Sequence, residues 1–176
     1  VGEAKKLLGI DPEDVLLSSF GFIAPNKRIN VALEAVANIR KRHPSVRYAL
    51  IGEVVNGYDV SSLVARLHLE DTVRLVGYAD AKTFATYLRA TDIGINLRFP
   101  TFGETSATLL ALMAAGKATL VSNLDAFVEL PEYACVKIDV GPGELAQIEA
   151  LLSALIEDHG LRERIGANAV EHVRET

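Results

Sequence analysis

A short polar cluster, Gly103-Glu104-Thr105-Ser106, separates an apolar strand pattern from a helix pattern that is apolar nearly all round. Before the cluster, Ile93 and Ile95 alternate with small or polar residues, which is the period of a strand. Unpaired backbone N–H groups and the helix dipole favour an anion at the start of a helix. The cluster therefore predicts a binding site for a phosphate group at this strand-to-helix turn.

A second loop, Gly21 to Arg28, places two cations where a helix pattern begins. Positive charge opposes the helix dipole there, so Lys27 and Arg28 are disfavoured unless an anion lies between them. This conflict favours a phosphate ligand, and a pair of exposed surface cations is the alternative. The G-x-G-x-x-G fingerprint of dinucleotide-binding proteins does not follow the preceding strand pattern, so a dinucleotide site is excluded here.

The segment from Glu104 to the Met-Ala-Ala-Gly-Lys stretch at 113–117 resembles the donor-site block of the retaining glycosyltransferases of family GT4, whose fold is called GT-B. In that family the block reads glutamate, seven residues, a second glutamate, then Ala-Met-Ala-x-Gly. Here Ala111 stands at the position of the second glutamate and Gly103 at that of the first, so Glu104 is displaced by one residue. What remains resembles a variant branch that reads Pro-Thr-x-Gly-Glu-Thr-Ser.

The resemblance implies roles for the polar cluster. Glu104 would be a catalytic residue that hydrogen-bonds hydroxyl groups of the donor sugar near the reacting carbon. Its alternative role is to cap the helix, where a carboxylate contributes about 0.3–1 kcal/mol. Thr105 and Ser106 would present backbone N–H and hydroxyl donors to the diphosphate of the donor.

The resemblance also implies which cations bind the donor diphosphate. Lys27 falls on the family's diphosphate-binding lysine, and it would act catalytically by stabilising charge on the leaving group. Phe22 occupies the position of the family's arginine, and Arg28 would replace the missing charge.

Residues at other strand ends would complete the donor-binding set. Gly21 opens the cationic loop, Gly52 resembles the family's second strand end, and Gly77 with Tyr78 resembles the loop that holds the nucleotide base. Glycine lets a base approach the main chain closely. Tyr78 would either stack on the base or cap the sheet edge, two alternatives that stay open. Glu129 resembles a family glutamate in the loop after the fifth strand.

Strand and helix patterns alternate along the whole chain. Short connections of this kind predict a doubly wound, Rossmann-like α/β fold with a parallel six-stranded sheet, helices on both faces and two C-terminal helices. Ligands bind such sheets beyond the carboxyl ends of the strands, where the strand order reverses. Strands are expected at 15–20, 48–52, 72–76, 93–97, 118–121 and 134–138, and helices at 1–8, 28–42, 59–69, 82–89, 106–115, 125–130, 144–157 and 161–173.

Composition restricts the class of protein. A chain of 176 residues suits a single domain, 1–176, and the net charge of −5 argues against a nucleic-acid partner. No apolar run approaches the roughly 20 residues that span a bilayer, so we expect a soluble, cytoplasmic protein.

The single cysteine, Cys135, is predicted to pack in the core without a chemical role. The four histidines have no ligand spacing, so no metal is expected. The chain starts at Val1 and its only methionine is Met113, which suggests a piece of a longer protein.

By resemblance, the chain is the C-terminal half of a GT-B enzyme that binds a UDP or GDP sugar and transfers the sugar with retention, without a metal or another cofactor. Such enzymes serve polysaccharide or glycolipid biosynthesis. The acceptor would be held by an N-terminal domain outside this chain, and any peripheral membrane association would come through that half. The isolated chain would bind nucleotide weakly and transfer nothing. Two alternatives remain: a sugar-nucleotide epimerase of the same fold, and a nucleotide-binding scaffold domain that has lost catalysis.

Overall fold

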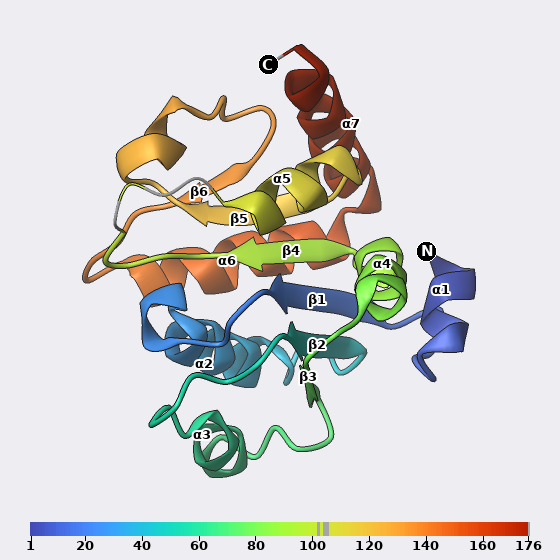
Figure 1. Ribbon diagram of the computed structural model, residues 1–176, viewed down its shortest axis with the longest axis vertical. Coiled ribbons are helices and arrows are strands. Elements are labelled where there is room, and N and C mark those ends of the chain that lie inside the picture. Colours follow the sequence, from blue (N-terminus) through green and yellow to red (C-terminus); the bar gives the residue numbers. More distant parts are fainter. Residues whose placement is uncertain (102, 104–105, 176) are drawn as a thin grey trace.

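Six parallel strands form the centre of the molecule in the order β3-β2-β1-β4-β5-β6 (Figure 1). The computed structural model describes residues 1–101, 103 and 106–175. The strand order reverses between β1 and β4, so the predicted doubly wound sheet is confirmed. The strands are β1 (Val15–Phe20), β2 (Val46–Ile51), β3 (Val73–Gly77), β4 (Ile93–Asn96), β5 (Ala118–Ser122) and β6 (Val136–Ile138).

The helices follow the predicted pattern, with small differences at their ends. The second helix ends at Ile39 rather than at Arg42, because Arg42 N donates to Ile39 O at 2.9 Å and closes a tighter turn. The segment after β5 is a 3₁₀ helix rather than an α-helix. In chain order the helices are α1 (Gly2–Leu7), η1 (Pro25–Lys27), α2 (Ile29–Ile39), α3 (Val60–Arg66), α4 (Ala81–Ala90), α5 (Ala107–Ala114), η2 (Asp125–Glu129), α6 (Glu144–Glu157) and α7 (His159–Glu175).

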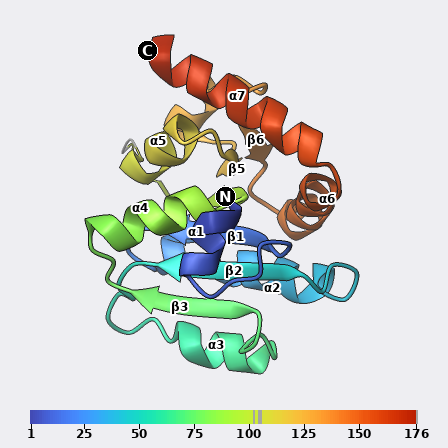
Figure 2. The same cartoon turned by 90° about the vertical axis from the view of Figure 1, so that its right-hand side faces the viewer.

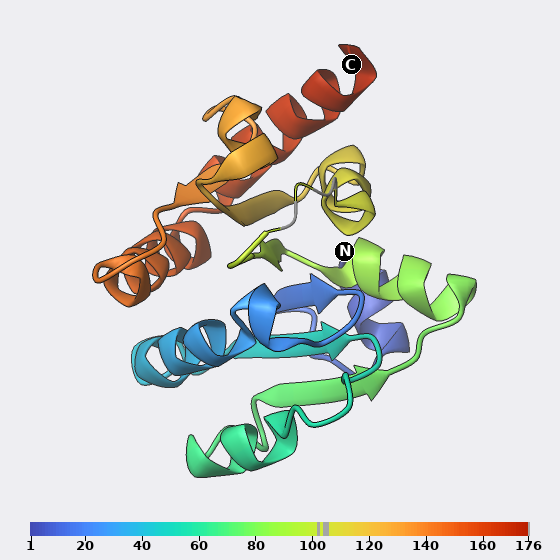
Figure 3. The same ribbon diagram turned by 60° about the vertical axis from the view of Figure 1, so that its left-hand side comes forward.

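The helices cover both faces of the sheet. Figure 3 shows α2, α3 and α6 on one side of the strands and α1, α4 and α5 on the other. Alternate residues of β1 serve the two sides: Leu17 belongs to the core under α2, whereas Leu16 belongs to the core under α4. Figure 2 shows β3 and α3 at one edge of the molecule and α7 at the opposite edge, where α7 contacts α5 and β5.

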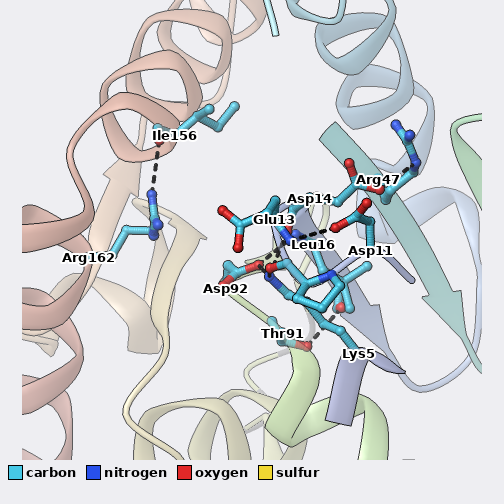
Figure 4. A network of polar contacts seen from close by, with 12 residues as sticks. Lys5, Asp11, Glu13, Asp14, Leu16, Arg47, Thr91, Asp92, Ile156 and Arg162 are labelled. Atoms are coloured by element: carbon cyan, nitrogen blue, oxygen red, sulfur yellow. Dashed lines mark hydrogen bonds and ion pairs between the residues drawn. The ribbon is translucent and has the colours of Figure 1, made fainter. Parts of the chain in front are cut away.

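A polar network at the amino ends of the strands fastens α1 to the sheet (Figure 4). The buried Lys5 ammonium lies 2.7 Å from a carboxylate oxygen of Asp92 and donates to the carbonyl oxygens of Asp14 at 2.6 Å and Pro12 at 3.2 Å. The same Asp92 oxygen accepts from the backbone N–H of Leu16 at 2.7 Å. The network therefore joins α1, β1 and the start of β4 at the end of the sheet opposite the loops expected to bind ligand.

The described part of the chain contains no helix that is both long enough and apolar enough to cross a bilayer. Cys135 is buried, and burial raises the pKa of its thiol to about 11, which fits the inert packing role expected of it.

Replacing Lys5 by alanine should lower the free energy of unfolding by about 3 kcal/mol, because Asp92, whose side chain is only 12% exposed, would lose the cation 2.7 Å away. Urea denaturation monitored by circular dichroism measures the change. Lys6→Ala, an exposed neighbour on the same helix, is the matched control and should change stability by less than about 0.5 kcal/mol. Equal stability of the two variants would contradict the anchoring role of Lys5.

Candidate functional site

A hollow of about 400 Å³ opens at the carboxyl ends of β1 and β4, where the strand order reverses. The loop after β1 forms one wall, and the loop after β4 with the first turn of α5 forms the other. Among its described lining residues none is acidic. They are Gly21, Phe22, Ala24, Asn26, Lys27, Arg98, Ser106, Ala107 and Thr108.

Lys27 brings a partly buried ammonium group into this hollow. Its Nζ donates to the carbonyl oxygen of Phe20 at 2.8 Å, and no carboxylate of the described residues pairs with it. Burial, and then the positive charge of Arg98, lower the pKa of Lys27 to about 8. Gly21 makes room for the ammonium, because a Cβ on that residue would lie 2.8 Å from Nζ and its φ of +84° favours glycine. The site therefore holds a lysine whose charge lacks a counter-ion within the described protein.

Arg98 is the residue of this hollow that the sequence analysis missed. It lies two residues after the end of β4, and its backbone N–H donates to the hydroxyl of Ser122 at 2.8 Å. Its Nη2 donates to the hydroxyl of Ser106 at 3.2 Å. The one signal in the sequence was its place at the end of a strand, which many surface arginines share. Arg98 gives the hollow a second cation, on the wall facing the loop of Lys27.

Ser106 begins α5 as predicted, but its hydroxyl is engaged inside the protein. It donates to the side-chain oxygen of Asn96 at 3.0 Å, and accepts from the backbone N–H of Leu109 at 3.2 Å as the N-cap of α5. Ser106 lines the hollow, and the predicted contact of its hydroxyl with a ligand stays a prediction. Ala107 and Thr108 begin α5 and line the hollow, and because the first N–H groups of a helix have no acceptor within it, those of these two residues can bind an anion.

Arg28 does not line the hollow, contrary to the sequence expectation. Its Nε donates to Oε1 of Glu144 at 3.0 Å, and its Nη2 pairs with the other carboxylate oxygen. The hydrogen bond with Glu144 also raises the pKa of Arg28. Its charge is thus matched by Glu144, and Arg98 stands where Arg28 was expected.

A second, mostly apolar hollow of about 260 Å³ adjoins the first and shares Gly21, Phe22 and Thr108 with it. It brings together Gly52 and Tyr78, two residues predicted to serve one site. A Cβ on Gly52 would lie 2.1 Å from the carbonyl oxygen of Gly21, so only glycine fits between these loops. Tyr78 is 77% exposed, so it is not packed as a cap of the sheet edge.

Four predicted residues gain no support from the described structure. Glu129 is exposed on η2 and lines neither of the two hollows. Glu104 and Thr105 lie outside the described residues. Gly77 has a φ of +73° with open space where a side chain would be, next to Tyr78, and its predicted contact with a base stays a prediction.

Another hollow, of about 570 Å³, lies at the opposite ends of the strands. Four carboxylates line it, from Asp11, Asp14, Glu70 and Asp71, with Arg47 and Arg74 as cations. Arg47 is already paired with Asp14 at 3.1 Å. An excess of carboxylates disfavours a phosphate ligand, so charge selects the smaller hollow at the carboxyl ends as the candidate site. No group of three or more His, Cys, Asp or Glu suited to a metal ion occurs within the described residues.

Sequence comparison relates the chain to enzymes that transfer sugars. A family model described as glycosyl transferases group 1 matches residues 2–172. D-inositol 3-phosphate glycosyltransferase 2 of Catenulispora acidiphila is 31% identical over 183 aligned positions, covering 96% of this chain and 41% of that protein. D-inositol 3-phosphate glycosyltransferase of Actinosynnema mirum is 28% identical, covering 98% of this chain and 43% of that protein. The chain spans about two fifths of the length of these curated relatives.

Solved structures with the same fold include Anabaena Alr3699/HepE in complex with UDP, with a TM-score of 0.86 at 18% identity. That match covers 99% of this chain and 47% of the other. The C-terminal domain of a glycosyl transferase group 1 family protein, LpcC, from Francisella tularensis has a TM-score of 0.81 at 22% identity. That match covers 99% of this chain and 91% of the other. At these identities the likeness establishes the fold alone.

The Lys27 side chain should titrate near pH 8, well below an ordinary lysine, and Arg98→Gln should raise this pKa because a neighbouring positive charge is removed. NMR titration of the Lys27 side-chain nitrogen in the ligand-free protein measures both values. Arg89→Gln, on α4 outside the lining of the hollow, is the control and should leave the Lys27 titration unchanged. A Lys27 pKa near 10.5 would show that the ammonium is solvated and not held in the hollow.

Proposed function

This chain belongs to the group 1 family of glycosyltransferases, and we propose that it is the domain that binds a nucleoside-diphosphate sugar donor. The observation that carries the proposal is the hollow between β1 and β4, where Lys27 and Arg98 line the wall without an acidic side chain among the described residues. A diphosphate is the ligand whose charge matches two cations and a helix N-terminus.

The adjoining apolar hollow is the proposed site of the nucleotide base. It continues from the phosphate hollow through Gly21 and Thr108, so one ligand can extend across both. Tyr78 offers an exposed ring on which a base can stack, and the glycine at Gly52 brings two loops together beside it. Anabaena Alr3699/HepE, which has the same fold, forms complexes with UDP and with UDP-glucose, which supports UDP as the first nucleotide to test.

In the proposed transfer reaction, the bond between the sugar and the diphosphate breaks and negative charge grows on the leaving diphosphate. Lys27, Arg98 and the N-terminal turn of α5 would stabilise that charge through fixed donors, without a metal ion. Glu104 would bind the hydroxyl groups of the sugar, and the sugar would keep its anomeric configuration, as the family resemblance implies.

The acceptor is proposed to bind a second domain, because the chain spans about two fifths of its relatives' length. The isolated domain would then bind nucleotide without transferring sugar. A binding domain without catalysis in the full-length protein is a second candidate, favoured by Ala111, which stands on α5 where the family's second glutamate binds the ribose. Turnover of a nucleotide sugar by the full-length protein distinguishes the two.

Lys27→Met should weaken UDP binding by about tenfold or more, since a hydrogen bond to a charged group contributes about 1.5–3 kcal/mol. In the unsubstituted protein, affinity should also fall as the pH rises through about 8, because the free lysine loses its proton there. Isothermal calorimetry with UDP and with GDP measures both effects. Lys41→Ala, an exposed lysine beyond α2, is the control. Unchanged UDP affinity in Lys27→Met would contradict the proposal that the diphosphate binds in this hollow.

Glu104→Ala should leave UDP affinity within about twofold and weaken UDP-glucose, because the proposed contacts of Glu104 are with the sugar and not with the nucleotide. The same calorimetric titration, run with both ligands, gives the ratio of the two affinities. Glu129→Ala, an exposed glutamate that lines neither hollow, serves as the control. Equal loss of UDP and UDP-glucose affinity in Glu104→Ala would contradict a sugar contact and favour a role in shaping the helix start.

A further inference from the structure

The loop that carries Lys27 is held firmly at its first end. Gly21 N donates to the carbonyl oxygen of Ile51 at 2.9 Å, and Ile23 N donates to that of Glu53 at 2.8 Å. These two bonds extend the pairing of β1 with β2 beyond the end of the sheet. They fix the start of the loop, and the position of Lys27 then depends on how the loop ends.

The loop ends at Arg28, in a backbone conformation that favours glycine. Arg28 has φ 55° and ψ 28°, the left-handed region in which a Cβ crowds the following carbonyl. It joins η1 to α2, since its N–H donates to Pro25 O at 3.1 Å and its carbonyl accepts from Ala32 N at 3.1 Å. An arginine at this position is tolerated because its side chain makes contacts that glycine could not.

The side chain of Arg28 fastens this turn to two other parts of the fold. It forms a two-pronged ion pair with Glu144, the first residue of α6, which is 2% exposed. Its Cζ lies 5.8 Å from the ring centroid of Phe99 in the loop after β4. Phe99 N also donates to Asn26 O at 2.7 Å, one residue before Lys27. The turn beside Lys27 is therefore held by a pair of residues 116 positions apart in the chain.

We propose that Arg28 is a positioning residue, whose ion pair with Glu144 fixes the left-handed turn and thereby directs the Lys27 ammonium into the hollow. Because its charge is matched by Glu144, Arg28 acts through Lys27 and does not bind the diphosphate itself. The consequence for ligand binding rests on the proposed diphosphate site. The consequence for the position of Lys27 is independent of that proposed site.

The test removes the pair without changing the net charge. In the double variant Arg28→Gly/Glu144→Gln, glycine accepts the left-handed turn and no bare carboxylate is left buried. The pKa of Lys27 in the ligand-free protein should rise by about one unit or more toward its ordinary value, because the released side chain reaches water. UDP affinity should fall by about fivefold. The double variant Arg40→Gln/Asp71→Asn removes another ion pair, in which Asp71 is 82% exposed, and should change neither quantity.

The two readouts separate the ways in which this proposal could fail. A folded variant in which the Lys27 pKa and the UDP affinity are both unchanged overturns the proposal. An unchanged Lys27 pKa with weakened UDP binding also overturns it, because Arg28 would then touch the ligand directly. A raised pKa with unchanged UDP affinity overturns the link to binding. If the unsubstituted protein binds no UDP, the diphosphate site fails while a raised pKa still supports the positioning role.

A milder variant keeps the test decisive if the double variant does not fold. Arg28→Lys preserves the charge but replaces the two-pronged contact with Glu144 by a single one. It should raise the Lys27 pKa and weaken UDP binding in the same direction, by smaller amounts. No change in either readout for this folded variant would overturn the proposal as well.

Discussion

The candidate site depends on one constraint. The ammonium of Lys27 is partly buried without a carboxylate partner among the described residues, and such a charge is costly until an anion arrives. The carbonyl oxygen of Phe20, 2.8 Å from Lys27 Nζ, supplies a dipole and not a charge. Arg98 increases the cost, as the lowered pKa of Lys27 indicates. Gly21 and Gly52 belong to the same arrangement, since a Cβ on Gly21 would displace the Lys27 ammonium and a Cβ on Gly52 would collide with the backbone of Gly21. A diphosphate would supply the negative charge that Lys27 lacks among the described residues.

The doubly wound topology is what brings these groups together. Lys27 and Arg98 are 71 positions apart in the chain, yet β1 and β4 are neighbours in the sheet, with Leu17 opposite Ile93. Their carboxyl ends open on the same side, and α5 starts there with its free N–H groups. The hollow at the opposite ends is larger but lined by four carboxylates, so its charge suits a different kind of ligand, if any. Charge therefore distinguishes the two ends of the sheet, whereas volume does not.

The sequence predicted the fold well because the relevant signals are local. The predicted bounds of β1 and α6 agree with the structure at both ends. Each element has a local signal, a short apolar run for β1 and apolar residues at helical spacing for α6. Of the predicted residues, Lys27, Gly52 and Tyr78 line the two connected hollows, whereas Arg28 lines neither and the unpredicted Arg98 lines one of them. The direction of Arg28 is decided by Glu144, which lies 116 positions away, and no local pattern contains that partner. The hydrogen bond from the Ser106 hydroxyl to Asn96 could not be predicted for the same reason, because the two side chains meet only in the folded chain.

The most direct test of the central claim is to map UDP onto the folded domain by NMR, following backbone amide shifts through a titration to saturation. The account predicts shifts confined to the loops at 21–27, 52–53 and 77–79, the loop at Arg98 and the first turn of α5, around the two connected hollows. Shifts centred instead on 9–14 and 70–75, where the acidic hollow lies, would contradict the account. So would saturating UDP that leaves the amides of both loops beside Lys27 and Arg98 unmoved.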